Sequence, residues 1–177
     1  GNEEQDLEVM RVPETGPWQV RIVGNRFPAV SHEPELMRSY AGLVRHISGV
    51  GYHEVIVETS HHNSCAALET PESVAEVFHA FIDRAWQIQA DPRIEYILFF
   101  KNHGRQAGAS LIHPHAQLIA LPMVPTDVRV RADEARKYFD EFGNCVFCEM
   151  MRHEAQDGSR IILETDHFLV FCPYASV

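Results

Sequence analysis

One amphipathic helix between short β-rich runs is the feature that most constrains how this chain folds. Thr70-Pro71-Glu72 supplies an N-cap residue, a proline at the first helical position and an acid in the first turn. Apolar residues then recur at helical spacing, and the pattern stops before Asp91-Pro92, which predicts a helix of about five turns. A single long helix among strands favours an α+β fold.

The strands are predicted from alternation and from β-branched and aromatic content. Residues 18–23 and 53–58 alternate apolar with polar side chains, and residues 93–100 and 113–121 are rich in β-forming types. Several of these strands follow one another with only loops between them, so the sheet is expected to be mostly antiparallel with flanking helices.

A change in the pattern near residue 143 predicts the end of the first domain. A charged amphipathic helix expected over residues 132–142 ends at Gly143-Asn144, which is a plausible cap and boundary. We therefore expect one domain over residues 1–143 and a second, incomplete one over residues 144–177.

The second part is predicted to repeat the first. A helix at 149–154 precedes strands at 160–164 and 168–172. The strand-turn-strand segments 20–27 and 162–168 are weakly alike, which suggests an internal duplication cut short at residue 177.

Charge excludes some classes of partner. Fifteen Lys and Arg against twenty-five Asp and Glu give a net charge of −10 and a pI of about 5.5. A nucleic-acid or anionic membrane partner is not expected, because such partners select basic surfaces. No apolar run approaches the roughly 20 residues that span a bilayer, and residues 1–6 lack signal-peptide character, so we expect a cytoplasmic protein.

The run His113-Pro-His-Ala-Gln117 is the sharpest chemical motif. Alternation in a strand is expected to place His113, His115 and Gln117 on one face. The simple alternative is the solvated side of an edge strand, marked by Pro114. Neutral imidazole is a good nucleophile toward phosphorus and a good metal ligand, so the motif favours phosphoryl or nucleotidyl transfer.

A polar, glycine-containing loop precedes this motif. Asn102, Gly104, Gly108 and Ser110 lie between two predicted strands, where backbone N–H groups and a hydroxyl can contact phosphate oxygens. Such a loop alone is usually only a turn, and its closeness to the histidines gives it weight.

Three segments resemble one known family. Residues 91–122, with Phe99-Phe-Lys-Asn-His-Gly104 and Gly108-Ala-Ser-Leu-Ile-His-Pro-His-Ala-Gln117, are similar to galactose-1-phosphate uridylyltransferases, the transferase branch of the histidine-triad superfamily. Residues 17–30 and 51–58 fit the same pattern. The resemblance implies a histidine-triad-like antiparallel sheet, with the start of a second copy after it.

The resemblance also implies residue roles. His115 matches the nucleophile that takes the nucleoside monophosphate covalently, and Gln117 matches the residue that hydrogen-bonds the transferred phosphoryl group. Histidine-triad hydrolases carry a third histidine at that place, so glutamine favours transfer to a sugar phosphate or phosphate over transfer to water. The implied nucleotide and phosphate contacts are Asn25, Asn102, Gly108 and Ser110.

Zinc is the cofactor that the resemblance implies. His113 and His62 match zinc ligands, and family members normally add a Cys-x-x-Cys immediately before a Gly-Asn-Glu segment, with which this chain begins. Two imidazoles do not make a tight structural site, so zinc is weak or absent unless the sequence is a fragment. Cys145 and Cys148 resemble a pair that begins a second zinc site in some members, and two buried structural thiols are the alternative.

The expected function is transfer of UMP between UDP-glucose and a hexose 1-phosphate through a uridylyl-histidine. Its substrates would be a nucleoside diphosphate sugar and a sugar 1-phosphate, and family members are commonly homodimers. One alternative is adenylyl transfer from ADP-glucose or a diadenosine polyphosphate to phosphate. Another is a nucleotide- or zinc-binding module without turnover.

Overall fold

The computed structural model describes residues 7–109 and 111–175, and the chain forms two compact units. The first extends to Val124, and the second begins at Pro125. Within the described ranges, none of the helices combines the length and the apolar character needed to span a bilayer.

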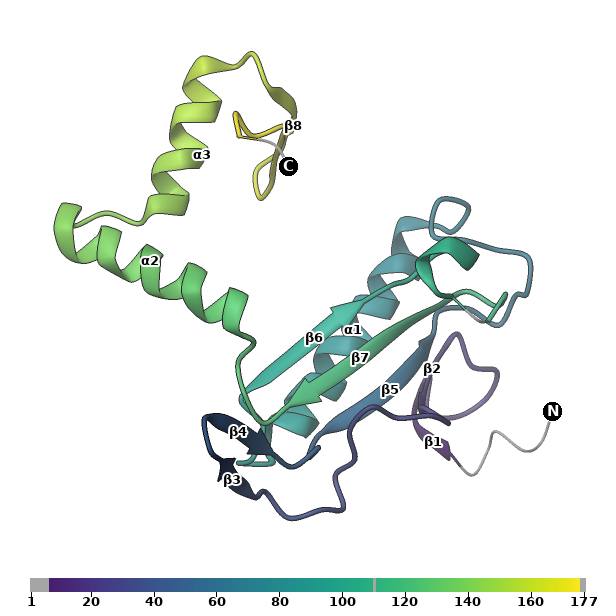
Figure 1. The fold of residues 1–177 in the computed structure, drawn as a ribbon. Coiled ribbons are helices and arrows are strands. Elements are labelled where there is room, and N and C mark those ends of the chain that lie inside the picture. The colour runs from purple at the N-terminus through teal and green to yellow at the C-terminus, as the bar shows by residue number, and fades with distance from the viewer. Residues whose placement is uncertain (1–6, 110, 176–177) are drawn as a thin grey trace. The chain divides into compact units, whose positions relative to one another are not determined.

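A five-stranded sheet forms the centre of the first unit (Figure 1). Its strands are β1 (Glu8–Val12), β2 (Val20–Gly24), β5 (Tyr52–Val57), β6 (Tyr96–Phe100) and β7 (His115–Leu121). They lie in the order β1-β2-β5-β7-β6, and each neighbouring pair is antiparallel. The predicted α+β class and antiparallel sheet are confirmed.

Helix α1 (Pro71–Gln89) packs along one face of this sheet (Figure 1). The Thr70 hydroxyl accepts the N–H of Ser73 at 3.2 Å, as the N-cap motif predicts. The apolar core joins α1 to β2, β5 and β7 through Val20, Ile22, Ile56, Val77, Ala80, Ile88, Ala116, Leu118 and Ala120. Burial of this helix face stabilises one side of the sheet.

A buried ion pair also joins α1 to the sheet. Arg84 donates to both carboxylate oxygens of Glu54 at 2.9 and 2.6 Å, and Glu54 is 4% exposed. Since Glu54 lies in β5, this bidentate contact fixes the helix against the strand. Removing one partner of such a pair would leave an uncompensated buried charge.

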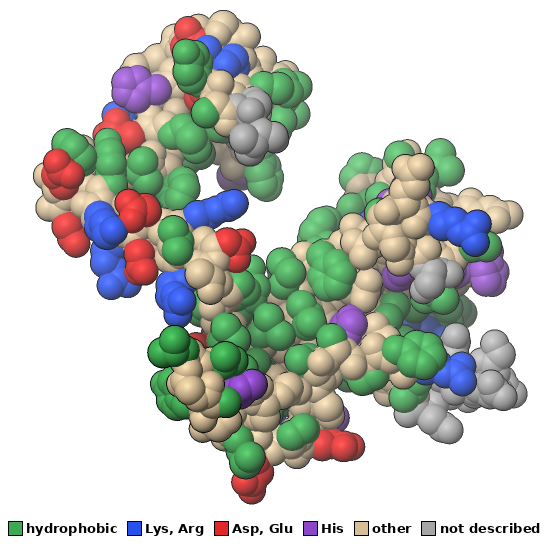
Figure 2. All heavy atoms as spheres, in the orientation of Figure 1, with side chains coloured by type: hydrophobic (Ala, Val, Ile, Leu, Met, Phe, Trp, Pro, Cys, Tyr) green, Lys and Arg blue, Asp and Glu red, His purple; other side chains and the backbone are tan. Residues whose placement is uncertain are grey.

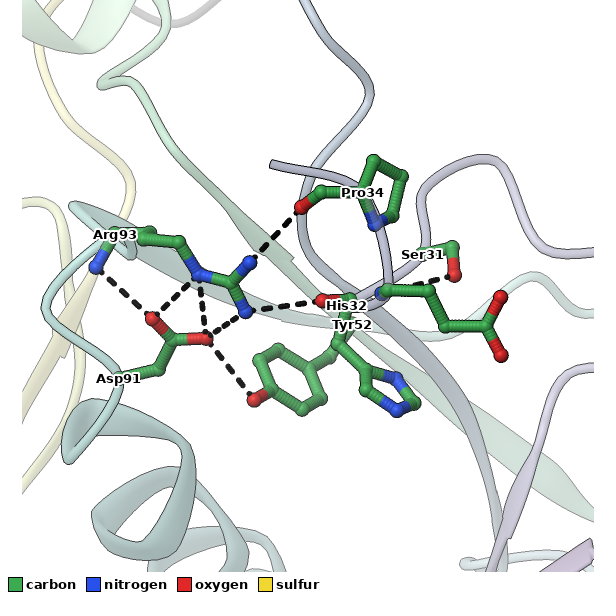
Figure 3. Close-up of polar contacts among 7 residues, drawn as sticks. Ser31, His32, Pro34, Tyr52, Asp91 and Arg93 are labelled. Carbon is green, nitrogen blue, oxygen red and sulfur yellow. Dashed lines mark hydrogen bonds and ion pairs between the residues drawn. The ribbon is translucent and has the colours of Figure 1, made fainter. Parts of the chain in front are cut away.

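Arg93 holds the loop before β3 (Arg38–Ala41) at His32 and Pro34, as Figure 3 shows. The guanidinium donates to the carbonyl oxygens of His32 and Pro34 at 3.0 and 2.9 Å, and pairs with Asp91 at 2.6 Å. Tyr52 donates to the same carboxylate at 3.1 Å. The backbone N–H of Arg93 also donates to the Asp91 carboxylate, which holds residues 91–93 in a turn. Strand β6, predicted to begin at residue 93, therefore begins at Tyr96.

The second unit consists of α2 (Thr126–Phe142), α3 (Val146–Asp157) and the hairpin β8 (Ile161–Glu164) and β9 (Leu169–Phe171). Buried Glu154 accepts from Arg160 at 2.6 Å and from the N–H of Tyr174 at 3.1 Å, which ties α3 to the hairpin and the segment after it. Charged side chains of both signs cover α2 (Figure 2), which has no buried residue in the described part of the chain. The proposed duplication and the boundary at residue 143 stay predictions.

Several predicted element bounds were wrong. The helix predicted at 132–142 begins six residues earlier, at Thr126, and that predicted at 149–154 spans Val146–Asp157. The hairpin of β3 (Arg38–Ala41) and β4 (Val44–Ile47) was not predicted. Strand β1 was missed too, because its alternation is interrupted by a bulge between Glu8 and Met10.

Gly51 is required where β5 begins. A methyl group there would lie 2.1 Å from the backbone oxygen of Ala120 and 2.9 Å from Cγ2 of Val30. Gly51→Ala is expected to lower the free energy of unfolding by about 3 kcal/mol, because the end of β7 would have to move. Gly49→Ala is the control, since its methyl would meet only the oxygen of Ala29, at 3.9 Å. Equal urea midpoints for the two variants would contradict this packing.

The Asp91 contacts predict a pH-dependent contribution to stability. Hydrogen bonds from Arg93, the largest cause, hold the pKa of Asp91 well below its ordinary value. The carboxylate therefore contributes fully above the unfolded-state pKa of about 4, and the contribution declines as pH falls toward the folded-state pKa. Asp91→Asn is expected to cost about 2 kcal/mol at pH 7 in urea unfolding, and less at pH 3.

The exposed Asp140→Asn of α2 provides the matched control and should show little change at either pH. A loss for Asp91→Asn that is the same at pH 7 and pH 3 would show that its charge does not support the fold.

Candidate active site

His115 is the first residue of β7, and one hydrogen bond selects the tautomer of its neutral ring. Its side chain is 8% exposed, and Nδ1 lies 2.9 Å from the carbonyl oxygen of His113. A carbonyl can only accept, so Nδ1 of the neutral ring carries the hydrogen and donates it. Nε2 therefore keeps its lone pair, which is the form of imidazole that attacks phosphorus.

Gln117 lies on the same face of β7 as His115, two residues further along the strand. The opposite face is formed by Ala116 and Leu118, both fully buried in the core with α1. Cross-strand pairing sets His115 opposite Val57 of β5. The sheet thus separates an apolar face beneath the helix from a face that carries the motif's polar groups.

A cavity of about 530 Å³ adjoins His115, within the range of small-molecule sites. It is lined by residues 101–105, 109 and 111–115, and by Ser64 and Cys65. Asn102, a predicted contact, lines it. Lys101 also lines it and pairs with Glu58 at 2.5 Å, so a cation is fixed at the cavity wall.

The loop before β7 turns through two glycines in the left-handed half of backbone space. Gly104 has φ of 80°, and Gly108 has φ of 83° and ends the short 3-10 helix η2 (Arg105–Ala107). The N–H of Gly108 donates to the carbonyl of Arg105 at 3.1 Å, so this group is already engaged. Gly108 permits the turn, and its predicted phosphate contact stays a prediction, while Ser110 lies outside the described residues.

His113 and His62, the two histidines predicted as zinc ligands, lie next to each other. Nε2 of His113 donates to the carbonyl of Thr59 at 2.6 Å, and Nδ1 lies 3.0 Å from Nδ1 of His62. His113 itself precedes the strand, so the expectation that it shares a strand face with His115 is wrong. The ladder begins one residue after Pro114, which has no N–H to extend it.

This pair does not by itself fit a closed zinc site. It offers two ring nitrogens where a structural site uses four ligands, and residues 7–109 and 111–175 contain no group of three or more His, Cys, Asp or Glu placed to hold a metal. The zinc role of His62 and His113 stays a prediction.

Cys145 and Cys148 lie in the second unit, at the start of α3. Both are exposed, so the alternative of two buried structural thiols is wrong. A hydrogen bond from the backbone N–H of Cys148 lowers the pKa of the Cys145 thiol, and the Cys145 side chain raises the pKa of Cys148. Their predicted zinc site stays a prediction.

Asn25, another predicted nucleotide contact, reaches the site through a residue that sequence reasoning missed. Its Nδ2 lies 3.2 Å from Nε2 of His53, and the same ring nitrogen lies 2.9 Å from Oε1 of Gln117. His53 occurs within a run of alternating apolar and polar residues, so the sequence could predict on which face of the strand its side chain lies. Its partners on β7 and after β2 depend on strand register, which alternation does not specify.

Comparison with known proteins places this geometry in a family. A model of the galactose-1-phosphate uridyl transferase N-terminal domain matches residues 18–125. ADP-glucose phosphorylase of Arabidopsis thaliana is 36% identical over 172 residues, which are 96% of this chain and 48% of that protein. Galactose-1-phosphate uridylyltransferase of Thermotoga maritima is 31% identical over 151 residues, 85% of this chain and 47% of that protein.

Solved structures agree. A GalT-like protein from Arabidopsis thaliana superposes with a TM-score of 0.81 at 35% identity and covers 96% of this chain and 52% of that one. The ADP-glucose phosphorylase of the same plant, with bound ADP-glucose, gives 0.79 at 32% identity over 96% of this chain and 51% of that one. The chain thus spans about half the length of these relatives.

The antiparallel sheet, helix α1 against one of its faces and the His-x-His-x-Gln motif that leads into β7 define an α+β domain of the histidine-triad type. Within that class, the chain belongs to the galactose-1-phosphate uridyl transferase family.

Proposed function

We propose that the first unit carries out nucleotidyl transfer from a nucleoside diphosphate sugar. The supporting observation is the hydrogen bond from His115 Nδ1 to the His113 carbonyl, which leaves the lone pair of the neutral ring on Nε2 of a residue that lines the cavity. Family membership and the names of the relatives support the same chemistry.

The reaction has two displacements. The Nε2 lone pair forms a bond to the α-phosphorus while the bond between that phosphorus and the bridging oxygen breaks. The electron pair of the broken bond stays on the bridging oxygen, which leaves as part of the sugar 1-phosphate. An oxygen of the acceptor phosphate then attacks the same phosphorus and displaces Nε2. Positive charge on the ring during attack is stabilised by the Nδ1–H donated to the His113 carbonyl.

Gln117 and the cavity wall would bind the nucleotide phosphates. The Gln117 amide nitrogen can donate to a non-bridging oxygen, since Oε1 is occupied by His53. Asn102 is one of the donors that line the cavity. Donors held in place before reaction stabilise transition-state charge without reorganisation.

The nucleotide and acceptor define two candidates. The first is UMP transfer between UDP-glucose and a hexose 1-phosphate, which the family match over residues 18–125 supports. The second is adenylyl transfer from ADP-glucose to phosphate, supported by the 36% identity to an ADP-glucose phosphorylase and by the similar structure with bound ADP-glucose. Contacts to the base distinguish them.

Intact mass after incubation with each donor tests both candidates. We expect an acid-labile increase of one nucleoside monophosphate in the unchanged protein and none in His115→Ala, because this variant lacks the Nε2 lone pair proposed to attack. UMP from UDP-glucose supports the first candidate, and AMP from ADP-glucose supports the second.

His79→Asn serves as the control for a histidine substitution, since His79 lies on α1 with a side chain 66% exposed. It should form the adduct at the rate of the unchanged protein. No adduct from either donor, or an adduct retained in His115→Ala, would contradict the proposed mechanism.

A further inference from the structure

His53 connects the motif on β7 with the loop that follows β2. Its Nδ1 lies 3.0 Å from the backbone nitrogen of Ala29, and its Nε2 lies 2.9 Å from Oε1 of Gln117. The residue is in β5, which lies between β7, the strand that contains Gln117, and β2, the strand that precedes the loop with Ala29. A half-buried ring therefore joins the loop at residues 25–29 to the predicted phosphoryl contact.

The protonation form of His53 follows from its backbone partner. The N–H of Ala29 can only donate, so Nδ1 accepts and carries no hydrogen. In the neutral ring the hydrogen is then on Nε2, which donates to Oε1 of Gln117. This is the opposite form from His115, whose hydrogen is on Nδ1.

The neighbouring amide of Asn25 is fixed separately. Its Oδ1 accepts the backbone N–H of Phe27 at 2.9 Å, which directs Nδ2 toward the His53 ring at 3.2 Å. Because His53 Nε2 carries a hydrogen, Nε2 does not accept a hydrogen bond from Nδ2 of Asn25, and Nδ2 cannot accept one from Nε2. Gln117 is thus the acceptor for His53, and Asn25 does not compete for that bond.

A fixed amide orientation matters for phosphate chemistry. A glutamine side chain has a donating and an accepting end of nearly equal shape, and rotation about its last bond exchanges them. With Oε1 held by His53, the NH₂ group is the free end. The exchanged orientation would present a carbonyl oxygen to the phosphoryl oxygens and repel them.

We propose that His53 is a positioning residue for nucleotidyl transfer, which fixes the Gln117 amide with its donor toward the transferred phosphoryl group. The same ring couples that orientation to the backbone of Ala29. The inference rests on the proposed function, since it assigns His53 a part in forming the His115 adduct. His53 acts through Gln117 and makes no contact with the reacting atoms itself.

Two substitutions test the roles of the two ring nitrogens of His53 separately. His53→Gln can place an amide nitrogen near Nε2 and keep the donor to Gln117, whereas His53→Asn keeps an acceptor near Nδ1 and loses that donor. Rapid-quench measurement of adduct formation, with the active donor, should show a rate lower by about 10- to 100-fold for His53→Asn. His53→Gln should recover most of that rate, and the donor concentration for half-maximal rate should change little.

A double-mutant cycle with Gln117→Ala tests whether His53 acts through Gln117. In that background His53→Asn should cause no further loss, because the amide that it positions is gone. Circular dichroism and urea unfolding of each variant identify folding defects, and His53→Gln provides a second variant if His53→Asn does not fold. His79→Asn is again the control.

The outcomes separate the two proposals. An adduct in the unchanged protein, with equal losses from His53→Asn in both backgrounds, overturns the role of His53 alone. A full rate in His53→Asn, or no recovery in a folded His53→Gln, overturns it as well. Absence of any adduct in the unchanged protein overturns the proposed function, and the role of His53 with it.

Discussion

The antiparallel pairing of β5 with β7 is the constraint on which the site depends. Its register sets Val57 opposite His115 and Val55 opposite Gln117, and places His53 two pairs further along, opposite Ile119. All these residues share one face, because paired residues in a sheet point to the same side. A shift by one residue would turn the polar groups toward α1 and the core alanines and leucine toward the cavity. The buried face therefore protects the geometry of the polar face.

Backbone groups then decide what the histidines can do. The carbonyls of His113 and Thr59 and the N–H of Ala29 each have one possible role in a hydrogen bond, so each assigns the tautomer of the ring that it meets. The nucleophilic nitrogen of His115 and the donor of His53 result from main-chain geometry. No charged partner is needed to explain either tautomer.

Local signals predicted some elements well and others poorly. The N-cap and proline predicted the start of α1 because they act within one turn, and period-two alternation predicted the face shared by His115 and Gln117. The position of His113 depends on the β5–β7 ladder beginning only after Pro114, and the contact of His53 with Gln117 joins residues 64 apart in the chain. Such contacts arise from register and loop path, which one sequence specifies only through the whole fold.

The central claim is that His115 becomes nucleotidylated on Nε2 because Nδ1 is held by the His113 carbonyl. NMR of protein labelled with ¹⁵N-histidine, after reaction with a nucleoside diphosphate glucose, tests this at the level of atoms. The account predicts a one-bond ¹⁵N–³¹P coupling to Nε2 of His115, with its Nδ1 still protonated. A coupling to Nδ1 of His115, or to a nitrogen of any other histidine, would contradict it.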